Sequence, residues 1–253
     1  MNKKVTNTKI NSNYRERIYA NYGKNFQDAV VLFDEKASER WGSARNWHLR
    51  EWLPQDKFAK IVDLACGGGK LLHFFREQGY PNVSGVDISP DQVALSRQVI
   101  PDVIQGNVLD FMESHPGEFD LVIGFDIIEH LYKDEVLRFL DAAYNTLKPG
   151  GRLILQTPNS EGPWGAQYRY GDFTHEVGFN PNSLKRLMQL VGLTDIECRE
   201  CDPTPLGYSI FSTVRALLWQ FIRLVLMSYN LIETGGIGGR VLTRVFLATG
   251  VRR

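Results

Sequence analysis

The stretch from residue 61 to residue 70, IVDLACGGGK, constrains the fold more than any other part of the chain. Its apolar first half is long enough for one buried strand. It ends in three glycines, after which apolar residues recur at a helical spacing. Glycines at such a turn let the backbone approach a ligand closely, because no Cβ intervenes. The helix that follows offers free N–H groups and a partial positive charge, which suit a carboxylate or a phosphate. The pattern therefore predicts a strand, a tight turn and a helix around a ligand site.

The rest of the chain alternates between strand and helix patterns. Strands are expected at about 61–65, 83–87, 103–105, 119–125, 151–157 and 194–200, and helices at about 69–78, 90–99, 134–147 and 180–191. This alternation favours an α/β fold with a mostly parallel sheet and helices on both faces. Ligands of such sheets bind at the carboxyl ends of the strands. We therefore expect Gly67, Asp87, Asn107 and Phe125 with Asp126 along one edge of the sheet.

Five short motifs follow one another in an order that is more specific than the glycines alone. They are DLACGGGK from residue 63, GVDIS from 85, GNV from 106, FDLVIGFD from 119 and LKPGGRL from 147. With these motifs the chain resembles the class I S-adenosylmethionine-dependent methyltransferases, in particular the O-methyltransferases of glycan and quinone pathways. The resemblance implies a Rossmann-like seven-stranded sheet whose last strand is antiparallel, and residues 245–249 are the candidate for that strand. The alternative is a doubly wound fold that binds another nucleotide or none.

The resemblance also implies S-adenosylmethionine as the cofactor. The positions that it marks as cofactor-binding are Asp63, Ala65, Gly67, Gly69, Asp87, Ile88, Asn107, Val108 and Phe125. Asp87 is expected to accept hydrogen bonds from both ribose hydroxyls, and Ile88 to pack on the adenine. Asn107 stands where the family often has aspartate, and its amide oxygen can still accept from the adenine amino group. For Asp63 two roles stay open, contact with the cofactor or orientation of the glycine turn from behind.

The segment YRYGDFTHE, residues 168–176, is expected to form a loop at the same edge of the sheet. An imidazole, with an ordinary pKa of about 6.5, suits removal of a proton from an acceptor hydroxyl. His175 is therefore the first candidate for a general base, with Asp172 expected to orient it. His130, expected on the opposite wall, is the second candidate. The alternative is a packed turn whose polar residues only fix the loop.

Asp126, Glu129 and His130 follow the strand predicted at 119–125 and would share one face of a helix. Two carboxylates and an imidazole could hold a divalent cation. The arrangement is similar to a Glu-x-x-Glu-His element of ubiquinone-biosynthesis O-methyltransferases, for which a metal is implied, but here the first acid is one methylene shorter. We therefore expect no metal, with Glu129 and His130 as a hydrogen-bonding pair and Asp126 as a further catalytic candidate.

The pattern divides the chain into an N-terminal helical lid (1–57), a cofactor-binding core (58–205), an apolar helical insertion (206–240) and the final strand (241–253). The lid either only packs on the sheet or also covers ligand through Tyr22, Arg45 and Trp47. Within the insertion, residues 206–232 form a long apolar helical stretch.

Three interpretations of this apolar stretch stay open: an internal core helix, a lid over the substrate or a homodimer contact, and a helix on a membrane surface. Arg215 and Arg223 argue against a helix that spans the bilayer.

Composition limits the partners and the location. Lys and Arg together number 29, as do Asp and Glu, so the overall charge does not favour nucleic acid. Three cysteines form no even disulfide framework, and residues 1–7 lack the apolar segment of a signal peptide, so we expect a cytoplasmic protein.

The expected activity is O-methylation of a sugar or another small-molecule hydroxyl. The alternatives are a quinone or lipid-intermediate methyltransferase with peripheral membrane contact through 206–232, and a non-catalytic cofactor-binding scaffold.

Overall fold

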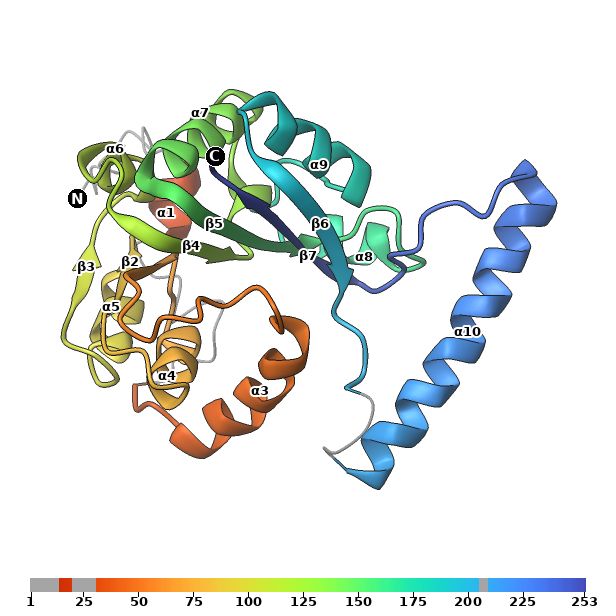
Figure 1. The fold of residues 1–253 in the computed structure, drawn as a ribbon, viewed down its shortest axis with the longest axis horizontal. Helices are drawn as coiled ribbons and strands as arrows, with labels where there is room; N and C mark the ends of the chain where they lie inside the picture. The colour runs from red at the N-terminus through yellow and green to blue at the C-terminus, as the bar shows by residue number, and fades with distance from the viewer. Residues whose placement is uncertain (1–13, 20–30, 205–208) are drawn as a thin grey trace, which may run out of the picture.

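The computed structural model describes residues 14–19, 31–204 and 209–253. Its described part contains one seven-stranded sheet of order β3-β2-β1-β4-β5-β7-β6 (Figure 1). The strands are β1 (Ile61–Leu64), β2 (Val83–Asp87), β3 (Val103–Gln105), β4 (Phe119–Phe125), β5 (Leu147–Pro158), β6 (Thr194–Glu200) and β7 (Val245–Val251). Strand β7 pairs antiparallel with both β5 and β6, while the pairs among β1 to β5 are parallel. The predicted fold and the predicted last strand are confirmed.

Helices cover both faces of the sheet because the central strands are apolar on both sides (Figure 1). The helices α3 (Glu35–His48), α4 (Lys70–Glu77) and α5 (Pro90–Ser96) lie on one face, and α6 (Val108–Ser114), α7 (Lys133–Thr146) and α9 (Pro181–Leu190) lie on the other. Alternate residues of β1 point to opposite faces. Ile61 packs in the cluster that contains Leu72 of α4, whereas Val62 packs in the cluster that contains Phe139 of α7.

The segment after β4 differs from the prediction. Residues Ile128–His130 form one short 3₁₀ turn, η1, and Asp126 precedes it with a φ of 53°. Asp126 therefore does not share a helix face with Glu129 and His130, and the predicted helical triad is wrong. Two helices of seven residues each, α6 and α8 (Gly165–Gly171), were also not predicted.

Packing between helices, as well as a ligand, accounts for glycine in the turn after β1. Gly69 caps α4 with a φ of 87°, which favours glycine, and a Cβ there would lie 3.0 Å from the Cα of Ser96. The turn thus brings α4 and α5 close together, and Gly69 serves this contact between helices.

Helix α10 (Ile210–Thr234) joins β6 to β7 and extends away from the sheet (Figure 1). Only Ser212 and Ala216 of this helix are buried. The interpretation of the stretch as an internal core helix is therefore wrong. By length and composition α10 could cross a membrane, since an 18-residue window within it holds no more than two charged residues. The two arginines thus do not exclude a span in the way that the sequence argument supposed.

Candidate functional site

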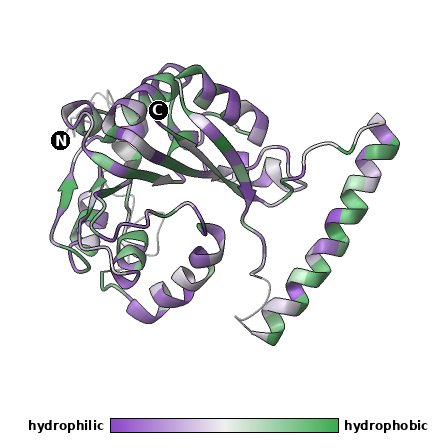
Figure 2. Cartoon of the chain, in the orientation of Figure 1, coloured by the Kyte–Doolittle hydropathy of each residue, from purple (hydrophilic) through white to green (hydrophobic). Residues whose placement is uncertain are grey.

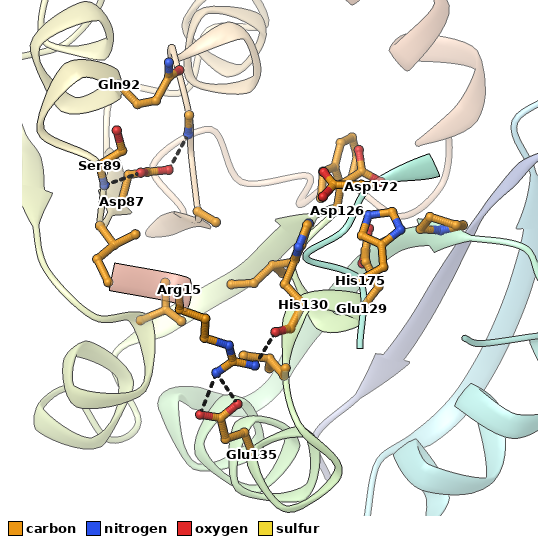
Figure 3. A pocket seen from close by; sticks show the side chains of 18 of the residues that line it. Arg15, Asp87, Ser89, Gln92, Asp126, Glu129, His130, Glu135, Asp172 and His175 are labelled. Atoms are coloured by element: carbon orange, nitrogen blue, oxygen red, sulfur yellow. Dashed lines mark hydrogen bonds and ion pairs between the residues drawn. The ribbon is translucent and has the colours of Figure 1, made fainter. Parts of the chain in front are cut away.

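A cavity of about 600 Å³ opens where β1, β2 and β4 end (Figure 3). The predicted cofactor-binding residues that line it are Ala65, Gly67, Asp87, Ile88, Asn107, Val108 and Phe125. All three catalytic candidates, Asp126, His130 and His175, line it too. Residues that are distant in sequence thus meet at one edge of the sheet, as the rule for parallel sheets predicts.

Two predicted cofactor-binding residues, Asp63 and Gly69, are not among the residues that line the cavity. Asp63 is buried within β1, 2% exposed, and burial together with the neighbouring Asp87 raises the pKa of its carboxyl well above its ordinary value. Of its two open roles, the buried position favours orientation of the turn. Gly69 contacts α5 instead of the cavity, as described above.

The carboxylate of Asp87 is held in place by backbone N–H groups at the end of β2. Gly67 N donates to Asp87 Oδ2 at 2.8 Å, and Ser89 N donates to Oδ1 at 2.8 Å (Figure 3). Burial raises the pKa of Asp87, and these hydrogen bonds act against that rise. Each carboxylate oxygen keeps a further lone pair with which to accept from a ligand hydroxyl. The arrangement fits a pair of neighbouring hydroxyls.

Asn107 has a structural role that the sequence argument missed. Its Oδ1 accepts from Leu109 N at 2.8 Å and so caps α6, and one lone pair of that oxygen remains for a ligand.

Strained backbone lies at the ends of two central strands. Ala65 after β1 has a φ of 58° and Asp126 after β4 has a φ of 53°, both in the left-handed region that favours glycine. Both residues line the cavity. Such strain persists where the surrounding structure fixes it, and it is typical of functional sites.

The two histidines are neighbours, so their predicted placement on opposite walls is wrong. Their ring centroids lie 4.7 Å apart in an edge-to-face arrangement. The hydrogen-bond partner of Asp172 also differs from the predicted one, His175. Asp172 accepts from the Thr174 hydroxyl at 2.6 Å, and this hydroxyl lies 2.8 Å from Nδ1 of His130. The hydrogen-bond chain from Asp172 therefore leads to His130 and not to His175.

The N-terminal helix α1 (Tyr14–Tyr19) adds a residue that no sequence pattern indicated. Arg15 lines the cavity, donates to Glu135 Oε2 at 2.7 Å and to the carbonyl oxygen of His130 at 2.5 Å (Figure 3). Tyr22, which the prediction of a ligand-covering lid included, lies outside the described residues. Arg45 and Trp47 are not among the residues that line the cavity.

Comparison with known proteins decides the family. Residues 33–198 match a family model described as a methyltransferase domain. The chain belongs to the class I S-adenosylmethionine-dependent methyltransferases. The cofactor of this methyltransferase is therefore S-adenosylmethionine, and the predicted family is confirmed.

Its curated relatives are matched only in part. It is 31% identical over 106 residues to the ubiquinone biosynthesis O-methyltransferase of Pseudomonas aeruginosa. The matched region covers 40% of this chain and 44% of that protein. It is 30% identical over 158 residues to the protein of that name from Xylella fastidiosa. Here the matched region covers 57% of this chain and 63% of the relative. The methyltransferase thus matches less than two thirds of the length of either relative.

Solved structures show the same fold at low identity. A S-adenosylmethionine-dependent methyltransferase from Archaeoglobus fulgidus gives a TM-score of 0.63 at 20% identity and covers 85% of this chain and 94% of its own. Phosphoethanolamine N-methyltransferase 2 from Haemonchus contortus, in complex with S-adenosylmethionine, gives a TM-score of 0.58 at 15% identity and covers 92% of this chain and 60% of its own.

The hydrogen-bond network assigns the protons of both imidazoles in the methyltransferase. Nδ1 of His175 lies 2.8 Å from the carbonyl oxygen of Tyr168, which can only accept, so Nδ1 carries the proton. The Thr174 hydroxyl donates to Asp172, and so it accepts from Nδ1–H of His130. In the neutral form both rings therefore keep a lone pair on Nε2.

Glu129, His130 and His175 form a group that could hold a metal ion. One potential ligand atom from each lies within 4.8 Å of the others. Glu129 Oε1 is buried without a partner among the described residues, while Oε2 accepts from the Thr157 hydroxyl at 3.0 Å. This donor set fits a divalent cation, which would make a bound hydroxyl more acidic. It is not the predicted set, because His175 takes the place of Asp126.

Burial controls the charge of this group in the metal-free protein. It raises the pKa of Glu129 well above its ordinary value, and the nearby Asp126 carboxylate raises it further. Burial lowers the pKa of His130 to about 4, and the adjacent His175 contributes to that decrease. Near neutral pH, His130 is therefore uncharged, and burial favours the protonated form of Glu129.

The low pKa of His130 predicts a loss of stability in acid. Between pH 6.5 and pH 4 the unfolded chain binds a proton at this residue while the folded protein does not, so the free energy of unfolding falls as pH falls. The shift to about 4 corresponds to about 3 kcal/mol by pH 4. Urea unfolding at pH 7 and pH 4, with EDTA present, should show a loss larger by about this amount in the wild type than in His130→Gln. Equal losses in both proteins would contradict the assignment.

Proposed function

We propose that this methyltransferase transfers the methyl group to a hydroxyl of a small acceptor, with His175 as the general base. The observation that supports this most is the Nε2 lone pair of His175, which the hydrogen bond from Nδ1 to Tyr168 fixes in a ring that lines the cavity. Asp87, the predicted ribose-binding residue, lines the same cavity at the end of β2. A cofactor with its ribose there can direct its sulfonium toward Phe125 and the histidines.

The cofactor supplies an electrophilic methyl group on a sulfonium. The oxygen of the acceptor hydroxyl attacks the methyl carbon while His175 Nε2 takes the proton of that hydroxyl. The carbon–sulfur bond breaks at the same time and leaves S-adenosylhomocysteine. His130 packs edge-on against His175 and restricts its ring. Gln156 donates to Asp126 Oδ2 at 2.9 Å and holds that carboxyl beside Phe125 at the proposed position of the methyl donor. Orientation of the two reactants is the main contribution of the protein.

A phenolic acceptor fits the site better than a sugar. Leu131, Pro158 and Val245 line the cavity together with Phe125 and give the acceptor side apolar walls. Three aromatic residues between residues 164 and 170 could stack on a sugar: Trp164, Tyr168 and Tyr170. Of these three, Tyr168 lines the cavity, whereas Trp164 and Tyr170 are 56% and 78% exposed and are not among the lining residues. The names of the curated relatives support the same class, because ubiquinone biosynthesis O-methyltransferases act in the synthesis of a quinone.

An acceptor panel tests this proposal. With S-adenosylmethionine labelled in its methyl group, the purified protein is expected to label alkyl catechols and to leave methyl glycosides unlabelled. Labelling of the glycosides alone would contradict the acceptor class. Cofactor binding without transfer to any member of the panel would favour the non-catalytic alternative.

The reaction is proposed to need no metal, since His175 can accept the proton alone and burial favours the protonated form of Glu129, which is a weak ligand. Dialysis against EDTA is therefore expected to leave the turnover of the best acceptor unchanged. Loss of turnover that Mg²⁺, Mn²⁺ or Zn²⁺ restores would refute this and assign the cation to Glu129, His130 and His175. In that case the added cation should not restore the turnover of Glu129→Gln, because this substitution removes a charged ligand.

A further inference from the structure

Helix α10 exposes a large apolar surface that the proposed reaction does not use. Phe211, Leu217 and Phe221 are 73%, 67% and 65% exposed, and Ile210 and Ile232 at the two ends are 87% and 86% exposed. Figure 2 shows apolar residues along the whole length of the helix. Exposed apolar patches of this extent on a folded protein mark an interaction surface.

The polar side of α10 faces its own domain. Trp219 Nε1 donates to Glu200 Oε2 at 3.3 Å, and Arg223 forms an ion pair with the same oxygen at 3.3 Å. The Ser212 hydroxyl donates to the carbonyl oxygen of Thr204. These contacts fix the rotation of the helix about its axis, so that the apolar side is the one directed away from the protein.

The apolar side is too wide for a single partner helix. We define it by the exposed residues Ile210, Phe211, Val214, Leu217, Leu218, Phe221, Ile222, Leu224, Val225, Leu231 and Ile232. At 3.6 residues per turn these residues cover about half of the circumference. The seam of a two-helix contact takes only about two positions in seven, so a second copy of α10 would leave much of the apolar side in water. A lipid phase covers such a surface entirely.

The charge of the region fits anionic lipid headgroups. Residues 206–244 contain four arginines and one acidic residue, Glu233, although the chain as a whole is neutral. Arg215 lies on the helix at the border of the apolar side, and Arg240 and Arg244 lie in the return segment, all three exposed. Each basic residue near an anionic surface contributes about 1 kcal/mol of attraction.

The return segment excludes a helix that crosses the bilayer. Both ends of α10 connect to the same sheet, and residues 235–244 lead back to β7 without helix or strand. A spanning helix would force this glycine- and arginine-containing segment through the hydrocarbon core with unpaired backbone groups, which is prohibitively costly. A helix that lies flat in the interface needs no such crossing.

We propose that α10 lies in the plane of a membrane surface that contains anionic lipids, with its apolar side in the acyl region. β6 ends and β7 begins at the edge of the sheet where the cavity opens, and Val245 of β7 lines that cavity. Membrane binding through α10 therefore brings the cavity close to the lipid surface. A membrane-borne acceptor could enter from there, but the membrane contact itself does not depend on the proposed reaction.

Vesicle sedimentation of the full chain tests the contact. The protein is expected to sediment with vesicles of phosphatidylglycerol and phosphatidylcholine, and less with phosphatidylcholine alone. The triple variant Leu217→Gln, Phe221→Gln, Leu224→Gln is expected to lower the partition coefficient at least about tenfold. The matched control Ile104→Gln, Leu137→Gln, Leu190→Gln changes three exposed apolar residues elsewhere and is expected to bind as the wild type does.

Binding of S-adenosylhomocysteine, measured for every variant, verifies that the cofactor site remains folded and separates failure of the membrane contact from failure of the proposed reaction. Wild-type protein that stays in the supernatant, or a triple variant that sediments as well as the control, would overturn the proposal. A wild-type dimer in solution that the triple variant dissociates, with no vesicle binding, would assign the apolar side to a second copy.

A labelling experiment tests the orientation. In Gly236→Cys, the added thiol follows the C-terminal end of α10. With a flat helix, a membrane-impermeant maleimide added outside the vesicles should label this thiol fully, relative to the wild-type background. Protection of the thiol until the vesicles are lysed would show that the helix spans the bilayer and would overturn the flat arrangement.

Discussion

The substitution Asp87→Ala is expected to weaken the binding of S-adenosylhomocysteine by at least about 10²-fold. A carboxylate that accepts from two hydroxyls contributes about 1.5–3 kcal/mol for each hydrogen bond, and its removal also leaves two backbone N–H groups without their acceptor. Isothermal titration calorimetry measures the dissociation constant directly.

The control for this substitution is Asp110→Ala, which removes a carboxylate with 76% of its side chain exposed, on α6. It is expected to bind the cofactor product as the wild type does. If Asp87→Ala binds with unchanged affinity while its melting temperature is normal, Asp87 does not hold the ribose and the cofactor lies elsewhere.

The substitution His175→Ala is expected to lower kcat by about 10²–10⁴-fold, the usual contribution of a general base. Affinity for S-adenosylhomocysteine should stay within about twofold, since the ring lies beyond the proposed cofactor site. His130→Ala is expected to have a smaller effect on kcat, because His130 is a poor proton acceptor with a pKa of about 4 and restrains His175 only by packing.

The comparison of the two histidine variants assigns the base. Wild-type turnover in His175→Ala would discard His175, and a larger loss in His130→Ala would transfer the role to His130. Equal losses in both, restored by added divalent cation, would indicate a shared metal ion instead.

The cofactor half of the site could be predicted from sequence because its signals are local. The glycine turn and Asp87 directly follow apolar strands, and parallel strands end at the same edge of the sheet. The motifs did not distinguish residues that line the cofactor cavity from residues that only pack inside the protein. Gly69 is required by the approach of α5, and Asp63 is buried inside β1, although both stand within the first motif.

For the acceptor half the sequence indicated Asp126, His130 and His175 but not their arrangement, because that arrangement depends on contacts between distant segments. The N–H groups of Glu176 and Val177 both donate to the carbonyl oxygen of Glu129, at 2.7 and 3.1 Å, and so bring the segment after β5 onto the turn after β4. This pairing places His175 against His130. Arg15 reaches the cavity from α1 in the same way, through Glu135, without any local pattern that indicates it.

For α10 the sequence correctly indicated a helix but not its surroundings. An apolar helical stretch of this length fits a protein core and a lipid surface equally well, because both are apolar. The exposure of its residues, which only the folded chain provides, excludes a core position, and the contacts of Trp219 and Arg223 with Glu200 direct its apolar side away from the protein.

A crystal structure of the complex with S-adenosylhomocysteine would test the central claim most directly. We expect the ribose hydroxyls within hydrogen-bond distance of the Asp87 carboxylate and the sulfur directed at the space between Phe125, His130 and His175. A ribose bound away from Asp87, or a sulfur that faces away from both imidazoles, would contradict the account.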